Sequence, residues 1–110
     1  MKRYCLALDL KDDEQLIAEY ERWHQDVWPE ILDSIKSSGI EHMQIYRAGN
    51  RLFMIMEVDA AFSFEKKAQA DKTNVKVQQW ETIMWKFQQS LPFAKSGEKW
   101  VLMDKIFELK

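Results

Sequence analysis

Hydrophobic and polar positions alternate near the start of the chain. Tyr4, Leu6, Leu8 and Leu10 fall on one side of an extended backbone, and Cys5, Ala7 and Asp9 fall on the other. A period of two residues is typical of a β-strand with at least one covered face. The pattern therefore predicts a strand from Arg3 to Leu10.

The next segment changes to the period of a helix. Asp12 and Asp13 suit an N-cap and an acidic first turn. Apolar and aromatic side chains then recur at steps of three and four: Leu16, Ile17, Tyr20, Trp23, His24 and Val27. Pro29 interrupts this helix but suits the first turn of a second one, predicted over 29–38 and ended by Gly39.

The remaining pattern predicts two strands, two helices and a last strand. In order, these are strands over 40–48 and 51–59, helices over 62–70 and 74–89, and a closing strand over 100–107. Gly49-Asn50 between the first two strands is a two-residue hairpin signal. The chain thus reads strand, helix pair, strand, strand, helix pair, strand. That order predicts one α+β domain over 1–110, ferredoxin-like, with a four-stranded antiparallel sheet and helices on one face.

Helices on one face leave the other face of the sheet bare. An apolar bare face needs a cover, and a second copy of the same chain supplies one by symmetry. The sequence therefore predicts a homodimer.

Composition excludes several classes of protein. The 110 residues are 46% hydrophobic and 31% charged, which is neither a disordered segment nor a membrane protein. A formal net charge of -2 without a basic stripe argues against nucleic acid as the partner. The single cysteine, Cys5, cannot form an internal disulfide, so we expect a reducing, cytoplasmic setting.

Tyr20 and His24 are the first candidates for chemistry. They are four residues apart, so in a helix they share the face that also carries Leu16 and Val27. Imidazole titrates near neutral pH and suits proton transfer. By spacing alone, a core histidine with satisfied nitrogens is the more common outcome. His42 has no recognisable ligand spacing with His24, so we expect no metal site.

Several motifs resemble the L-rhamnose mutarotase family. They are Glu19-Tyr20-Glu21-Arg22-Trp23-His24, Val27-Trp28-Pro29-Glu30, Ser38-Gly39, Ile45-Tyr46, Asn50-Arg51-Leu52-Phe53, Met56-Glu57, Gln79-Trp80 and the strand from Met103 to Phe107. The resemblance covers essentially the whole chain. It implies a ferredoxin-like dimeric α/β barrel, an isomerase that needs no cofactor, and a monosaccharide substrate.

The resemblance also implies roles for individual residues. His24 matches the family's proton-donating histidine, Tyr20 a substrate-binding tyrosine, and Trp80 the first of two adjacent tryptophans that hold the sugar. Glu81 stands where the family has the second tryptophan, and Met43 where it has a tyrosine. Both departures concern contacts with the sugar and leave the acid/base histidine in place. We expect His24 to shuttle the proton and Tyr20 to orient the sugar or to share in the proton relay.

The departures and three further motifs favour L-fucose over L-rhamnose. The motifs resemble the L-fucose branch of the family: Lys2-Arg3-Tyr4-Cys5, Tyr46-Arg47 before Gly49-Asn50-Arg51-Leu52-Phe53-Met54, and Gly97-Glu98-Lys99-Trp100. Glutamate accepts hydrogen bonds from sugar hydroxyls, whereas tryptophan only donates one. We expect Glu81 to bind hydroxyls or to act as a second acid/base group. Trp28 is a further candidate for the sugar pocket, with a core role as the alternative.

Two other functions fit the same fold, because fold alone does not fix function. One is a cofactor-independent monooxygenase, which oxygen uptake with a quinol substrate would reveal. The other is a non-catalytic binding domain, which would bind a sugar without speeding the exchange of its anomers.

Overall fold

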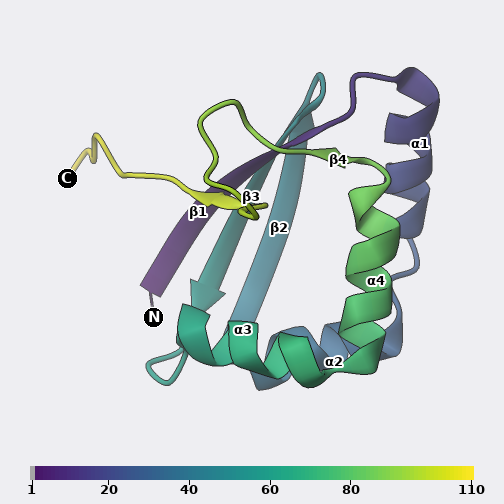
Figure 1. Ribbon diagram of the computed structural model, residues 1–110. Coiled ribbons are helices and arrows are strands. Elements are labelled where there is room, and N and C mark those ends of the chain that lie inside the picture. The colour runs from purple at the N-terminus through teal and green to yellow at the C-terminus, as the bar shows by residue number, and fades with distance from the viewer. Residues whose placement is uncertain (1) are drawn as a thin grey trace.

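The computed structural model describes residues 2–110 as a sheet with helices on one side (Figure 1). In chain order the elements are β1 (Lys2–Leu10), α1 (Glu14–Trp23), α2 (Pro29–Ser37), β2 (Ile40–Ala48), β3 (Arg51–Val58), α3 (Phe64–Thr73), α4 (Val75–Trp85), β4 (Gln88–Gln89) and β5 (Val101–Leu102). None of the helices within residues 2–110 combines the length and hydropathy of a membrane span. The predicted α+β class and the placement of helices on one face are confirmed.

The sheet is antiparallel, in the order β2-β3-β1-β4, with β5 also on β1. Along the outer edge of β1, β4 pairs with Asp9 and Leu10, and β5 pairs with Leu6 and Ala7. The fourth strand position is therefore filled by two short pieces, and the loop between β4 and β5 leaves the sheet.

The closing strand predicted over 100–107 is wrong beyond its first residues. The last backbone hydrogen bond to the sheet runs from Met103 N to Cys5 O at 2.8 Å. Ile106 and Phe107 are 96% and 76% exposed. The apolar pattern of this segment is typical of a strand, but a single chain provides no surface against which these side chains can pack. In Figure 1 the tail runs away from the sheet and the helices.

The helix predicted over 74–89 also ends earlier, at Trp85. Phe87 O accepts a hydrogen bond from Lys11 N at 2.8 Å, which turns the chain into the edge of the sheet. Phe87 remains buried, as the helical stripe predicted, and Gln88 enters β4 instead of continuing the helix.

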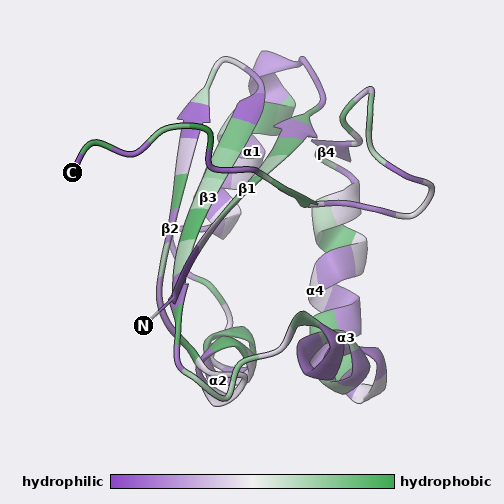
Figure 2. Cartoon of the chain, turned by 90° about the vertical axis from the view of Figure 1, so that its left-hand side faces the viewer, coloured by the Kyte–Doolittle hydropathy of each residue, from purple (hydrophilic) through white to green (hydrophobic). Residues whose placement is uncertain are grey.

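The core lies between the inner face of the sheet and the helices. β1 contributes Leu6, Leu8 and Leu10, and β3 contributes Leu52, Met54, Met56 and Val58, all buried. Hydrophobic residues also dominate the middle of these strands in Figure 2. Alternation along β1 and β3 thus points one set of apolar side chains toward the helices.

Gly39 ends α2 and allows the chain to enter β2. Its backbone φ is +100°, a value that residues with a side chain rarely adopt. A Cβ at this position would lie 2.6 Å from Asp59 Oδ1. That carboxylate already accepts a hydrogen bond from Ala61 N, and Asp59 N donates to Gly39 O. The positive φ of Gly39 and the nearby Asp59 carboxylate therefore both require glycine at this position.

We expect Gly39→Ala to lower the free energy of unfolding more than Gly97→Ala does. Both glycines have positive φ, which costs an alanine about 1–2 kcal/mol. Only at Gly39 must the added methyl group also displace a carboxylate, since nothing lies within 4 Å of a Cβ at Gly97. Urea denaturation of the two variants measures the difference, and equal losses would contradict this account of Gly39.

Candidate active site

A cavity of about 700 Å³ lies between the inner face of the sheet and the helices. Its wall includes five of the six residues singled out in the sequence: Tyr20, His24, Met43, Trp80 and Glu81. They come from α1, the end of α1, β2 and α4, which are far apart in the sequence. A partly open cavity of this size with apolar walls and a few polar groups is typical of a small-molecule site.

His24 lies at the C-cap of α1 and not inside the helix as the apolar spacing predicted. Its Nδ1 is 2.9 Å from the carbonyl oxygen of Tyr20. A carbonyl can only accept a hydrogen bond, so Nδ1 carries the proton, and Nε2 of the neutral ring carries the lone pair. The end of the helix therefore fixes the tautomer and leaves Nε2 as the nitrogen that can exchange a proton.

Tyr20 is buried one helical turn before His24. The two rings lie 4.4 Å apart between centroids. Burial raises the pKa of Tyr20 from 10.0 to about 12, and a hydrogen bond with the Gln88 side chain offsets part of that shift. At neutral pH the hydroxyl is therefore protonated and serves as a hydrogen-bond donor rather than a base.

Trp80 packs edge-on against three rings. The centroid distances are 5.9 Å to Trp23, 5.2 Å to Trp28 and 5.8 Å to His24, with interplanar angles of 90°, 69° and 73°. Edge-to-face contacts of this kind are favourable because ring edges carry positive charge and ring faces negative charge. Trp80 thus holds the imidazole of His24 at the cavity wall and forms part of that wall itself.

The sequence as a whole matches the family model described as L-rhamnose mutarotase over residues 3–109. The chain belongs to the L-rhamnose mutarotase family. It is 45% identical over 111 residues to the L-fucose mutarotase of Xanthomonas campestris pv. campestris, and the match covers 99% of this chain and 89% of that protein.

Solved structures share the fold. The L-rhamnose mutarotase of Formosa agariphila superposes with a TM-score of 0.73 over the full length of both chains, at 18% identity. Tetracenomycin F2 cyclase of Streptomyces glaucescens gives 0.61 over 100% of this chain and 98% of that one, at 13% identity. A polyketide cyclase on the same fold confirms that the fold alone does not decide the reaction.

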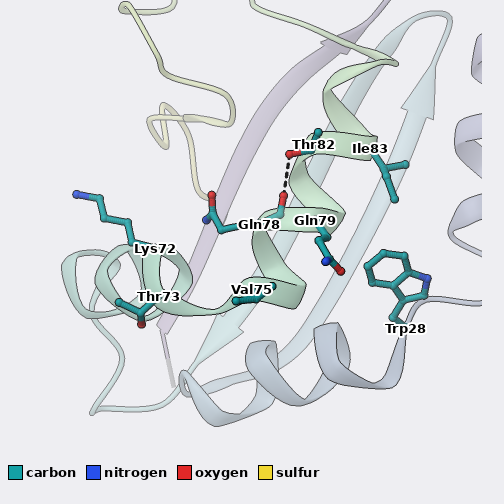
Figure 3. A pocket seen from close by; sticks show the side chains of 8 residues that line it. All are labelled: Trp28, Lys72, Thr73, Val75, Gln78, Gln79, Thr82 and Ile83. Carbon is teal, nitrogen blue, oxygen red and sulfur yellow. Dashed lines mark hydrogen bonds between the residues drawn. The ribbon is translucent and has the colours of Figure 1, made fainter.

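Within this mutarotase family fold, Trp28 does not line the cavity that holds His24. It packs against Trp80 and lines a separate hollow of about 550 Å³ beside α4, together with Gln79 and Ile83 (Figure 3). The geometry therefore gives no support to Trp28 as a sugar contact and favours its alternative role as a core residue.

The cavity wall also carries polar residues that were not predicted from the sequence, Gln88 and Lys99 among them. Gln88 is 6% exposed, and its Oε1 has no hydrogen-bond partner among residues 2–110. Lys99 comes from the loop before β5, and burial lowers its pKa. Gln88 was hidden by the helical pattern around it. Lys99 belonged to a motif of the family resemblance, but no periodicity marked it as facing a cavity.

We expect Tyr20 to make the fold less stable at alkaline pH. Unfolded tyrosine loses its proton near pH 10.0, whereas folded Tyr20 keeps it to about pH 12. Between those values only the folded state holds the proton, so stability falls as pH rises. The loss amounts to about 2–3 kcal/mol across this window.

Urea denaturation at pH 9 to 12 of the wild type and of Tyr20→Phe measures this effect. The wild type should lose more stability than Tyr20→Phe over the window, since both proteins share every other titrating group. Parallel curves would show that the Tyr20 hydroxyl is not desolvated by the fold.

Proposed function

We propose that the protein is a carbohydrate isomerase that interconverts the α and β anomers of L-fucose, with L-rhamnose as the alternative substrate. The observation that carries this proposal is the position of His24, with Nδ1 held by the Tyr20 carbonyl, on the wall of a cavity that Tyr20 and Trp80 also line. Membership of the mutarotase family and 45% identity to an L-fucose mutarotase support the choice of reaction and sugar.

Mutarotation inverts the configuration at C1 through two proton transfers, and the sugar gains or loses no proton overall. Nε2 of neutral His24 accepts the proton of the anomeric hydroxyl while the bond between C1 and the ring oxygen breaks. The His24 imidazolium delivers that proton to the ring oxygen, which becomes a hydroxyl, and C1 becomes an aldehyde carbon. Rotation about the bond between C1 and C2, followed by the reverse proton transfers, closes the ring on the other face of the aldehyde.

Tyr20 and Trp80 position the sugar in this scheme. The Tyr20 hydroxyl stays protonated, so it donates a hydrogen bond to a sugar oxygen and orients the ring beside His24. Trp80 offers its apolar surface to the C–H groups of the pyranose. Holding the reacting oxygen near Nε2 in this way removes much of the entropic cost of the proton transfer.

Met43 and Glu81 give the site its preference for one sugar. L-fucose and L-rhamnose differ in configuration at C2 and C4, so a pocket separates them through its contacts with hydroxyls. Glu81 supplies acceptor oxygens on the cavity wall, and Met43 supplies an apolar surface without a hydroxyl. A site built to bind a particular hydroxyl discriminates strongly against a sugar that places it elsewhere.

His24→Ala should reduce the rate of anomer exchange about 10²- to 10⁴-fold, which is the usual contribution of one positioned acid or base. NMR saturation transfer between the α and β anomers of L-fucose, repeated on L-rhamnose, measures that rate. His42→Ala is the matched control, because His42 is the other histidine and also borders the cavity, but is exposed. A folded His24→Ala protein with the wild-type rate would refute the role of His24.

We further propose that the enzyme acts as a cytoplasmic homodimer formed through the bare face of the sheet. The register of β3 with its neighbours β1 and β2 places Tyr46, Phe53 and Ile55 on that face, and Tyr46 is 54% exposed. The C-terminal tail adds exposed Ile106 and Phe107, and it passes in front of the strands on the side away from α1 (Figure 2). Covering this apolar surface with a second copy stabilises both chains.

Light scattering at micromolar concentration should give twice the 13.2 kDa mass of one chain. Deleting residues 104–110 should weaken the dimer, because the tail supplies apolar surface to the partner. A monomer mass for the wild-type protein would contradict the dimer, whatever the activity.

A further inference from the structure

Two ion pairs border the cavity, and they differ in whether the charged groups are hydrogen-bonded to each other. Lys67 and Asp71 lie on the same helix, α3, and Lys67 Nζ donates to both carboxylate oxygens of Asp71 at 2.9 and 3.1 Å. Lys99 and Glu81 come from the loop before β5 and from α4, and their Nζ and Oε2 atoms are 4.0 Å apart. The first pair is closed by hydrogen bonds, and the second is open.

The open pair, Glu81–Lys99, retains unused hydrogen-bonding capacity. A separation of 4.0 Å exceeds the 2.7–3.2 Å range of a hydrogen bond between nitrogen and oxygen. Neither side chain makes a hydrogen bond to any other residue in the described range 2–110. The ammonium group therefore has free N–H donors, and the carboxylate has free acceptor oxygens, at adjacent points on the cavity wall.

Lys99 is held in this position and is not simply a flexible surface lysine. Its Nζ lies 4.4 Å from the ring centroid of Trp85, a cation–π contact. Its side chain is 21% exposed. A desolvated ammonium is stabilised by oxygen atoms that accept its hydrogen bonds. The partly exposed Glu81 carboxylate, 4.0 Å away, stabilises the Lys99 ammonium only in part.

We propose that the open ion pair binds one hydroxyl of the substrate between its two charged groups and thereby selects the sugar. A hydroxyl both donates and accepts, so it can donate to the Glu81 carboxylate and accept from the Lys99 ammonium at once. This inference rests on the proposed sugar mutarotase function and adds Lys99 as a specificity-determining residue. Lys99 takes no part in the proton transfer, which remains with His24.

Lys99→Met should raise the KM for L-fucose roughly 10- to 100-fold, as expected for loss of a hydrogen bond to a charged group. The kcat should change much less, because the acid/base histidine is intact. Lys99→Arg should restore most of the loss, since it keeps the charge and the donors. Lys76→Met is the matched control: Lys76 also lies over a tryptophan, Trp28, but lines no part of this cavity.

The bound hydroxyl is identified by analogues of L-fucose that lack the hydroxyl at C2, C3 or C4. In the wild type, one analogue should show the same rise in KM as Lys99→Met does with L-fucose. In Lys99→Met that analogue should lose little more, because the two changes remove the same interaction. Glu81→Gln should reproduce this pattern for the same analogue.

Two results would overturn the proposal, and they are separable. If the wild type accelerates anomer exchange but Lys99→Met keeps the wild-type KM within about twofold, or its effect adds to that of every analogue, the open pair does not bind the sugar. If the wild type accelerates the exchange of no sugar, the mutarotase function itself fails, and the inference fails with it. Circular dichroism of each variant confirms that the fold is intact.

Discussion

The packing of aromatic rings around Trp80 is the interaction on which the active site depends. A fully collapsed core would bring the helices down onto the sheet and leave no cavity. Here Trp80 of α4 is wedged edge-on between Trp23, Trp28 and His24, and the helical layer meets the sheet through Leu10 and Phe87 at one end. Rigid aromatic side chains thus keep the helices in place around a cavity that flexible side chains would fill.

The same packing links the fold to the chemistry. α1 ends at Trp23, so the carbonyls of its last turn have no following turn to pair with, and Nδ1 of His24 lies 2.9 Å from the carbonyl oxygen of Tyr20. The need to satisfy a helix end therefore decides which imidazole nitrogen is free. Burial of Tyr20 under the same layer keeps its hydroxyl protonated. One helix terminus thus provides both a proton acceptor and a fixed donor.

Much of this arrangement could be predicted from the sequence, and the reasons for the exceptions are physical. Strand and helix periods located β1, β2, β3, α1, α2 and α4, because burial of one face imposes those periods. The family resemblance brought His24, Tyr20, Trp80, Glu81 and Met43 together on one cavity before any geometry was known.

What the sequence did not show depends on contacts between distant segments. The apolar period placed Gln88 near the end of a helix. In the structure, the hydrogen bond between Lys11 and Phe87 directs that segment into the sheet instead. The tail beyond Met103 has the pattern of a strand, but whether it pairs depends on a surface that a single chain does not provide. Lys99 lies in a loop without periodicity, so only the folded chain reveals its position beside Glu81.

The central claim is that Nε2 of His24 is the atom that exchanges protons with the sugar. A long-range proton–nitrogen NMR spectrum of nitrogen-15-labelled protein, recorded with and without L-fucose, tests it most directly. We predict that neutral His24 carries its proton on Nδ1, and that L-fucose shifts the Nε2 resonance while leaving Nδ1 nearly unchanged. A proton on Nε2 in the free protein, or an Nε2 resonance that saturating L-fucose does not move, would contradict the account.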